Sequence, residues 1–379
     1  MTYIAGSYTT KFGELWERDL RSLGIEAIEG ALKDANIELK DIDALYVANM
    51  AASRLSGQDH IGSLIASELG IDVPAYHIES ACASGGVAVR LGHLDILSGE
   101  SKNILVLGVE KMTDISNSGV TAALSGASDE EWEAFYGATF PSLYAMIARE
   151  HMRKFGTTRE QLALCSVKNH AFGSKNPHAQ FPFEITTEQV LDASPVADPL
   201  GLLDCSPISD GASAIVLSKE KKSDVKIISS AQAQDTISLH KRNDITELTA
   251  TVKAANKAFH SAGLNRNNID IVELHDCFSI AEILAYEDLG FAKKGEGGKL
   301  IESGKTGPGG SLPVNTSGGL KACGHPVGAT GVKQIAELAS QLSGSAGARQ
   351  ISKNLKYGLA HNVGGSGGTA VVHILAKVG

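Results

Sequence analysis

The chain contains an internal repeat, and this repeat constrains its fold more than any other feature of the sequence. The segment IEAIEGALKDANIELKDIDALYVANM begins at Ile25, and VKAANKAFHSAGLNRNNIDIVELHDC begins at Val252. A constant shift of 227 residues aligns alanines 27, 31 and 35 with alanines 254, 258 and 262. Residues spaced by four lie on one face of a helix, and alanines there allow close approach to another backbone. Because the spacing also holds through the following loop, duplication is favoured over chance similarity between amphipathic helices.

A second, weaker repeat relates two turns that each lead into a helix. ACASGGVAVRLGHLDILSG and ACGHPVGATGVKQIAELASQLSG both start with small residues and end in Leu-Ser-Gly. We therefore predict two copies of one unit, residues 1–218 and 224–379, joined by the charged stretch Lys219–Asp224. The region from about 113 to 204 has no counterpart in the second copy and is predicted to be an insertion.

Short apolar runs alternate with segments of helical periodicity along the chain. This alternation predicts an α/β protein, and near-continuous apolar strands suit a sheet covered on both faces. The predicted strands are Ile42–Val47, Ile104–Val109, Ala214–Leu217, Ile269–Leu274 and Ala370–Leu375. The predicted helices include Ser22–Ala35, Val87–Leu97, Val252–Ala262 and Val332–Leu342.

Charge and composition exclude several classes of protein. The 379 residues carry a formal net charge of −9, so a nucleic-acid-binding surface is not expected. No apolar run reaches the ~18 residues of a membrane helix, and the N-terminus lacks the pattern of a signal peptide, so we expect a cytoplasmic protein without membrane partners. The five cysteines show no CxxC spacing, which disfavours both a disulfide framework and a metal site.

The segment HIESACASGGVAVRLGHLDI holds the first candidate for chemistry. Cys82 follows an extended run and precedes a helix with apolar residues at Val87, Leu91 and Leu94. At a helix N-terminus, free N–H groups and the helix dipole stabilise a thiolate, so we expect a lowered pKa for this thiol. A buried cysteine that merely fills the turn is the equal alternative from this segment alone.

Three further segments place polar groups where strands or helices end. In LHDCFSIAEI, His275 and Cys277 follow a strand at the edge where open α/β sheets bind ligands, although a helix-capping turn explains them more simply. His325 lies between glycine and proline in a tight turn, which either fixes a general base or leaves a surface histidine. Gly364 opens a glycine-rich turn that is either an oxyanion-binding nest or a plain hairpin.

The combination of motifs resembles the thiolase superfamily over essentially the whole chain. The motifs are, in order, TKFGEL, ESACASGG, GVEKM, SDGASAIVLS, HDCF, GEGG…GGSLPVNTSGG and GHPVGATG. HDCF, where most thiolases carry Asn-Glu-Ala-Phe, points to the branch of sterol-carrier-type and archaeal acetyl-CoA acetyltransferases. The resemblance implies a five-layer α-β-α-β-α core of two similar halves, with the insertion as a loop domain over coenzyme A.

The resemblance also implies roles for individual residues. Cys82 matches the nucleophile that accepts the acyl group, and His325 matches the histidine that activates it. The second cysteine of most thiolases is replaced by Asn362, and in the HDCF branch Cys277 takes over its acid/base role. His275 would pair with His325 in one oxyanion hole, and Gly364 N–H with Cys82 N–H in the other. A Claisen condensation needs these parts: a thiolate, a base and two donor sets.

No permanently bound cofactor is implied, because coenzyme A arrives as the carrier of the acyl substrates. Thiolases form homodimers or tetramers, and archaeal members can associate with a 3-hydroxy-3-methylglutaryl-CoA synthase and a small zinc-ribbon/OB-fold protein. The resemblance therefore implies acetyl-CoA acetyltransferase activity and a place in the mevalonate pathway. A thiolase for longer 3-ketoacyl chains is an alternative within the same branch.

Three other functions fit the sequence less well. Aldolases that cleave steroid side-chain thioesters generally lack the nucleophilic cysteine, which this chain retains as Cys82. The HDCF motif argues against a 3-ketoacyl synthase and against a hydroxymethylglutaryl synthase. A non-catalytic acyl-CoA-binding or scaffold protein would have no need to keep Cys82, Cys277 and His325 together.

Overall fold

One nine-stranded sheet runs through the molecule. The structure is a computed structural model and describes residues 1–378. The strand order is β3-β2-β4-β7-β1-β8-β11-β10-β9, and a separate pair, β5-β6, lies outside this sheet. The strands are β1 (Thr2–Thr9), β2 (Ala44–Ala48), β3 (Ala75–Ile78), β4 (Asn103–Glu110), β5 (Pro195–Ala197), β6 (Leu200–Gly201), β7 (Gly211–Ser218), β8 (Val225–Gln234), β9 (Ile271–Glu273), β10 (Tyr357–Gly364) and β11 (Thr369–Lys377).

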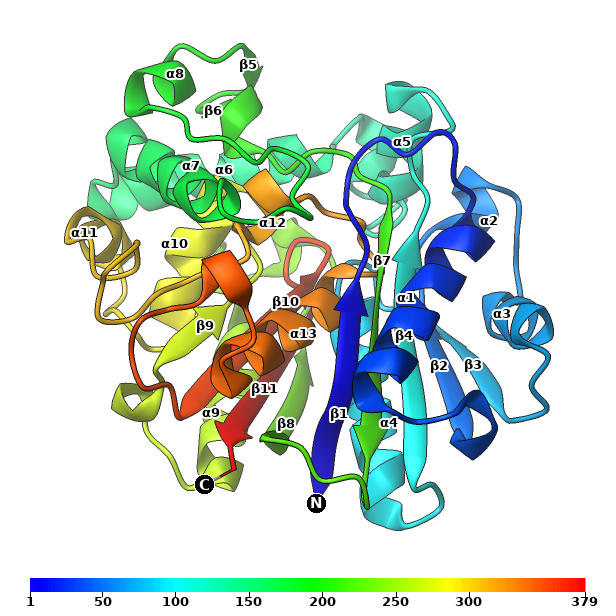
Figure 1. Cartoon of the computed structure of the whole chain (residues 1–379). Coiled ribbons are helices and arrows are strands. Elements are labelled where there is room, and N and C mark those ends of the chain that lie inside the picture. Colours follow the sequence, from blue (N-terminus) through cyan, green and yellow to red (C-terminus); the bar gives the residue numbers. More distant parts are fainter. Residues whose placement is uncertain (379) are drawn as a thin grey trace.

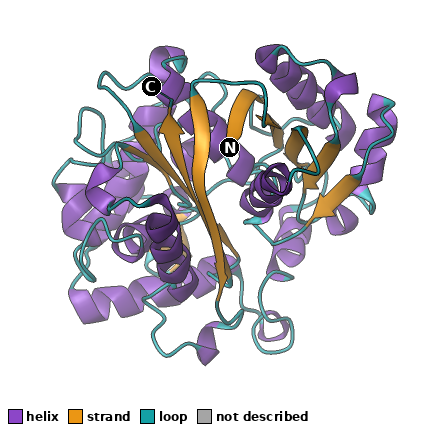
Figure 2. Cartoon of the chain, turned by 90° about the horizontal axis from the view of Figure 1, so that it is seen from below, coloured by secondary structure: helices purple, strands orange, loops and turns teal. Residues whose placement is uncertain are grey.

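Helices flank the strands on both sides, as Figure 2 shows. They are α1 (Leu20–Ala35), α2 (Ala52–Leu55), α3 (Ile61–Leu69), α4 (Ser84–Ser98), α5 (Asn117–Ser125), α6 (Phe140–Phe155), α7 (Arg159–Gly173), α8 (Thr187–Leu191), α9 (Thr249–Ala262), α10 (Ser279–Asp288), α11 (Gly297–Glu302), α12 (Gly319–Cys323) and α13 (Thr330–Ser343). No described helix is long and apolar enough to cross a membrane.

The two halves of the sheet repeat the same topology, which confirms the predicted duplication. In the first half β2 and β4 are parallel, and β4–β7 and β7–β1 are antiparallel. In the second half β9 and β10 are parallel, and β10–β11 and β11–β8 are antiparallel. The shift of 227 residues also superimposes the short 3-10 turns Leu39–Asp41 and Arg266–Asn268. The halves join where β1 pairs with β8 at only two residue pairs.

Helices α4 and α13 form a layer between the two half-sheets. They contact each other, and each also contacts strands of both halves. On the outer faces α1 packs on β1, β4 and β7, while α9 packs on β8 and β11. The order is therefore α-β-α-β-α, as predicted, and Figure 1 shows α13 between the strands of the two halves.

The alanine face of α1 packs directly on a strand. Ala27, Ala31 and Ala35 are fully buried. A methyl group added to Gly6 of β1 would lie 2.6 Å from the Ala31 carbonyl oxygen and 2.3 Å from the Ala35 nitrogen. The small residues on both elements thus allow backbone-to-backbone contact, as the sequence analysis predicted for the alanines.

Some element boundaries differ from the predictions. The predicted strand Ile269–Leu274 shortens to β9, because its parallel partner β10 pairs with it at only three positions and the Leu274 N–H bonds the Asn315 side chain instead. Strands β1, β8 and β10 were not predicted. Buried and half-exposed residues alternate along β8, which is the pattern of a strand with one covered face.

The insertion lies at the end of the sheet where β4 ends and β7 begins. Between β4 and β7 it forms α5 to α8 and the β5–β6 pair, at the top of Figure 1. Its helix α7 packs against α10, α11 and α12, which the second half carries between β9 and α13. The insertion therefore covers the edge of the sheet where the predicted site residues lie.

Candidate active site

The site forms where the N-termini of α4 and α13 meet. A methyl group on Gly85 would lie 2.8 Å from the Gly331 nitrogen, and one on Gly331 would lie 2.2 Å from the Gly86 nitrogen. Only glycines permit this contact between the two helix starts. The turns that precede the helices carry Cys82 and His325, so the weaker sequence repeat corresponds to two facing turns.

Cys82, His275 and His325 come together at this junction. Their ligand-type atoms, one sulfur and two ring nitrogens, all lie within 4.8 Å of one another. The two imidazole rings meet edge to face with centroids 5.1 Å apart. A cavity of about 200 Å³ is lined by Cys82 and His325 and also by Cys277. The structure thus brings together the four side chains that the sequence analysis singled out.

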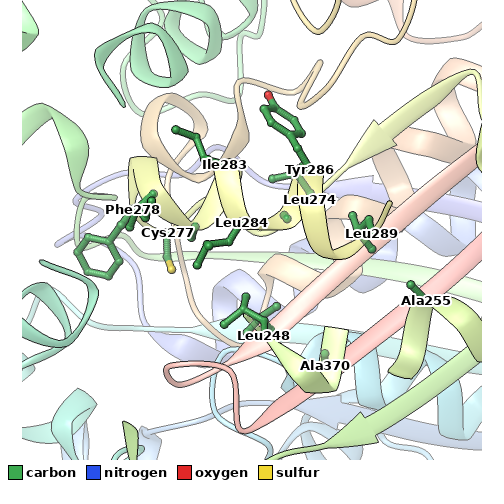
Figure 3. Close-up of a cluster of buried hydrophobic side chains, with 14 of the residues drawn as sticks. Leu248, Ala255, Leu274, Cys277, Phe278, Ile283, Leu284, Tyr286, Leu289 and Ala370 are labelled. Atoms are coloured by element: carbon green, nitrogen blue, oxygen red, sulfur yellow. The ribbon is translucent and has the colours of Figure 1, made fainter. Parts of the chain in front are cut away.

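The loop between β9 and α10 directs its side chains alternately. His275 and Cys277 face the site, whereas the Asp276 carboxylate points into the protein, where it accepts hydrogen bonds from Lys321 Nζ at 3.1 Å and Leu320 N at 2.9 Å. Every residue of α10 is buried, and Figure 3 shows Cys277 at the start of this helix within the surrounding hydrophobic cluster. The loop is therefore anchored on both sides of the reactive thiol.

The pKa of Cys82 contradicts the expectation from its helix position. Burial dominates and raises the pKa of this thiol to about 12. Hydrogen bonds from the backbone of Gly365 and of Cys82 itself favour the thiolate, but the nearby Glu110 and Glu79 carboxylates oppose it. The residue as a whole is partly exposed, and it lines the cavity. In the free protein the raised pKa therefore favours the thiol form of Cys82.

His325 lies beside Cys82 and is uncharged. Burial lowers the pKa of His325 to about 3, with Lys333 adding to the effect, so the ring is neutral. Its Nδ1 lies 2.7 Å from Thr330 Oγ1, and that hydroxyl donates to the Pro326 carbonyl at 3.1 Å. Because the hydroxyl hydrogen is used, Thr330 accepts from His325 Nδ1–H, which leaves a lone pair on Nε2.

His275 has a different environment. Burial, and then the charge that His325 would carry, hold the pKa of His275 well below its ordinary value. Its Nδ1 lies 3.3 Å from the side-chain nitrogen of Asn362, and its buried Nε2 has no protein partner among the described residues. Cys277 is also protonated, because burial and the neighbouring Cys82 raise its pKa.

The glycine turn after β10 closes the site. Gly364 ends β10, and Gly365, the next glycine of the predicted nest, lines the cavity and approaches the Cys82 sulfur with its backbone N–H. The Tyr144 hydroxyl, from the insertion, donates to the Gly365 carbonyl at 3.1 Å. The Tyr144 ring stacks on Phe278 with centroids 4.6 Å apart.

Tyr144 and Asn362 complete the surroundings of the reactive groups, and sequence reasoning gave neither of them a role in the site. Tyr144 lies in a helix of the insertion without a recognisable motif. The sequence did mark Asn362, because it occupies the position of a cysteine in most thiolases. Its contacts could not be predicted, because they are made to three separate segments.

The remaining cavity wall is mostly apolar. A wall of this kind excludes water and suits a small acyl group rather than a charged substrate. The apolar side chains of the wall are Met112, Leu124, Phe140, Ile208, Phe278 and Val327. The arrangement provides a nucleophile with a neutral base, a second thiol, and N–H donors around one small space, which is the equipment of acyl transfer with carbon–carbon bond chemistry.

Comparisons with known proteins agree with this chemistry. Residues 2–221 match the family described as Thiolase, N-terminal domain, and residues 231–377 match Thiolase C-terminal domain-like. The chain belongs to the thiolase family and is an acyltransferase of the thiolase type.

Among curated proteins the chain is similar to the acetyl-CoA acetyltransferase of Methanothermobacter thermautotrophicus, with 53% identity over 99% of both chains. It is 34% identical to sterol carrier protein 2 of Homo sapiens, covering all of this chain and 72% of that protein. The chain thus lies in the branch that HDCF indicated.

Solved structures share the fold. The Ltp2-ChsH2(DUF35) aldolase superimposes with a TM-score of 0.87 at 24% identity, covering 99% of this chain and 97% of that one. The acetyl-CoA acetyltransferase from Syntrophomonas wolfei gives a TM-score of 0.76 at 19% identity, covering 100% and 99% of the chains.

Proposed function

We propose that the protein is an acetyl-CoA acetyltransferase, which joins two acetyl-CoA molecules into acetoacetyl-CoA and coenzyme A or catalyses the reverse thiolysis. The observation that carries the proposal is the convergence of Cys82, His325 and Cys277 on one small apolar cavity. The 53% identity to an acetyl-CoA acetyltransferase supports the acetyl group as substrate.

The first half-reaction forms an acyl-enzyme on Cys82. His325 Nε2 takes the thiol proton as the sulfur attacks the thioester carbonyl, so no free thiolate is needed beforehand. The N–H groups of Cys82 and of the Gly364–Gly365 turn stabilise the tetrahedral oxyanion. When the carbon–sulfur bond to coenzyme A breaks, Cys277 protonates the leaving thiolate, and His325 keeps the proton that it received.

The second half-reaction forms the carbon–carbon bond. The Cys277 thiolate removes an α-proton from the second acetyl-CoA, and burial, which raises the pKa of this group, makes its thiolate a strong base. His275 Nε2–H and protonated His325 stabilise the enolate oxygen. The enolate carbon attacks the acyl carbonyl, Cys82 leaves as a thiolate, and His325 returns the proton to it, so the protein regains its starting state.

Partial reactions separate these roles. We expect Cys82→Ala to abolish both directions, because no acyl-enzyme can form. Cys277→Ala should still acetylate Cys82, seen as a mass increase and a burst of free coenzyme A, but more slowly, because the leaving thiolate must then take its proton from His325. Condensation should fall by about 100-fold or more. Cys165→Ala, which removes a buried thiol outside the cavity, is the matched control. Unimpaired condensation by Cys277→Ala would contradict the proposed base.

The size of the cavity leads to a substrate preference. A space of about 200 Å³ with a mostly apolar wall suits a short acyl chain of about two to four carbons. A panel of 3-ketoacyl-CoA substrates should therefore show a decline in kcat/KM beyond four carbons. A maximum at longer chains would favour the alternative of a longer-chain thiolase, and binding without turnover would favour a scaffold protein.

We further propose that the chain works as a homodimer or tetramer. The sheet edge at β3 is paired only with β2, and Tyr76 on this strand is 46% exposed. A second copy would extend the sheet at this edge. Sedimentation velocity tests the assembly, and a monomer at micromolar concentration would contradict it.

The wider setting remains a proposal that follows from the resemblance to archaeal thiolases. It comprises a cytoplasmic location and a role in the mevalonate pathway. The proposed partners are a 3-hydroxy-3-methylglutaryl-CoA synthase and a small zinc-ribbon/OB-fold protein. Coenzyme A serves only as the carrier of the substrates. Co-purification of tagged chain with these two partners is the direct test.

A further inference from the structure

The central cluster has the donor set of a metal site as well as that of a thiolase. Cys82, His275 and His325 offer one sulfur and two nitrogens within 4.8 Å, and Cys-His-His is a ligand set that zinc accepts. A metal would disable the nucleophile. Whether it can bind depends on which ring nitrogens carry lone pairs, because a protonated nitrogen cannot coordinate.

Asn362 determines which ring nitrogen of His275 carries a lone pair. The orientation of the Asn362 amide is itself fixed by two backbone groups. Its Oδ1 accepts a hydrogen bond from Gly86 N–H at 3.0 Å, and its Nδ2 donates to the Cys82 carbonyl at 3.0 Å. These partners have opposite polarity, so exchanging the amide oxygen and nitrogen would break both bonds.

The amide is also confined in space. A methyl group on Gly331 would lie 2.3 Å from Asn362 Oδ1, and one on Gly86 would lie 3.0 Å from the same atom. The glycines at the starts of α4 and α13 therefore form a slot that holds the amide in one orientation. Asn362 comes from β10, so three segments meet at this side chain.

The second hydrogen of the amide determines the tautomer of His275. Asn362 Nδ2 lies 3.3 Å from His275 Nδ1, and an NH2 group can only donate there. Nδ1 must therefore hold a lone pair, and the hydrogen of the neutral ring lies on Nε2. This Nε2 is the atom without a protein partner among residues 1–378.

We propose that Asn362 is a positioning residue that locks His275 in the Nε2–H tautomer, which both supplies an oxyanion donor and prevents the Cys82–His275–His325 cluster from binding zinc. Metal-binding histidines usually donate their other ring N–H to a carboxylate or carbonyl, which leaves a lone pair for the metal. At His275 Nδ1, where a metal-binding histidine would meet an acceptor, Asn362 instead presents a hydrogen-bond donor. The use of the donor in catalysis rests on the proposed function, whereas the tautomer and the metal exclusion do not.

The tautomer can be observed directly in the unaltered protein. In the full chain labelled with 15N-histidine, NMR should show His275 with a protonated Nε2 and an unprotonated Nδ1 at neutral pH. His275→Gln assigns the signals by their disappearance. A protonated Nδ1 on His275, alone or together with a protonated Nε2, would overturn the proposal whatever the activity of the enzyme.

A substitution should convert the cluster into a metal site. Asn362→Asp replaces the donor with a carboxylate, which accepts Nδ1–H and frees the Nε2 lone pair of His275. At about pH 8.5, titration with Co²⁺ should give thiolate-to-cobalt absorption in this variant and none in the wild-type protein. The absorption should vanish in Asn362→Asp combined with Cys82→Ala. Cobalt binding by the wild type, or no binding by folded Asn362→Asp, would overturn the metal exclusion.

Kinetics test the oxyanion role separately. Asn362→Asp and Asn362→Leu, assayed with a chelator present, should lower condensation by about 100-fold, the usual loss for one oxyanion donor. Acetylation of Cys82 should persist, because its oxyanion hole uses backbone N–H groups. Equal loss of both half-reactions would overturn the assignment to His275. If the proposed function itself were wrong, neither protein would condense acetyl-CoA, but the NMR and cobalt results would still stand.

Discussion

At the scale of single residues, two neighbouring buried histidines, His275 and His325, differ because their Nδ1 atoms meet different partners. Thr330 accepts from His325 Nδ1, so Nε2 of His325 carries a lone pair. Asn362 donates to His275 Nδ1, so Nε2 of His275 is a donor. Burial keeps both rings neutral by lowering their pKa values. The identity of the neighbour, rather than the histidine itself, assigns the role.

Cys82 gives a testable consequence of burial. We expect alkylation of Cys82 by iodoacetamide in the free enzyme to accelerate about tenfold per pH unit from about pH 7 to about pH 9, because the thiolate is a minor species far below a pKa of about 12. The measurement is mass spectrometry of the Cys82 peptide. Cys205 is an internal control, since burial raises its pKa to about 12 as well. A plateau below pH 8 would indicate a preformed thiolate–imidazolium pair instead.

At the scale of elements, the N-terminus of α4 affects the pKa of Cys82 through the burial of the thiol more than through the helix dipole. The turn before α4 carries Cys82, at the helix position predicted for it. However, the facing helix α13 encloses that turn, and the resulting desolvation outweighs the stabilisation of charge at a helix N-terminus. The close contact between the helices thus sets both the position and the protonation state of Cys82.

The contact between α4 and α13 can be tested with one methyl group. Gly331→Ala would place that methyl 2.2 Å from Gly86 N and 2.3 Å from Asn362 Oδ1, so the helices must separate. We expect a loss of about 1–3 kcal/mol in the free energy of unfolding and a large loss of condensation activity. Urea denaturation and initial rates measure the two effects. Gly307→Ala, where the new methyl meets only ordinary contacts of 3.6 Å or more, is the control. Equal stability of the two variants would contradict the close contact.

At the scale of the whole molecule, each half depends on the other. Twelve of the fourteen residues of α13 are buried, and this helix contacts strands of both halves. Cys82 and His325 come from opposite halves, so this cluster exists only when the halves are assembled. The connecting stretch 219–224 is mostly exposed and lies between the ends of β7 and β8.

A split chain tests this dependence and the proposed boundary between residues 1–218 and 224–379. Fragments divided between Lys221 and Lys222 should be insoluble or loosely folded when each is expressed alone, because the middle helical layer would lose half of its cover. Co-expressed fragments should reassemble with thiolase activity close to that of the intact chain. Circular dichroism and activity assays measure the outcomes. A cooperative unfolding transition in either isolated fragment would show that the half is an independent domain.

Much of the architecture followed from local patterns. The alternation of apolar runs and helical periodicity predicted the α/β class, and the repeat at 227 residues predicted two related halves. The termini of the shortest elements, such as β9, were less accurate because they depend on a neighbour: its length is set by where β10 pairs and where Asn315 intervenes. Strands β1, β8 and β10 escaped notice because polar residues and glycines interrupt their apolar pattern.

The sequence by itself determined which candidate site residues exist and which family's motifs they match, because cysteines, histidines and turn glycines are read from residue type and local spacing. Only the tertiary structure decided the protonation of Cys82, the tautomers of the two histidines and the contributions of Asn362 and Tyr144. Those properties depend on burial and on hydrogen-bond partners that lie up to several hundred residues away along the chain. Electrostatic and hydrogen-bonding energies act through space, and no local pattern encodes a neighbour that folding alone supplies.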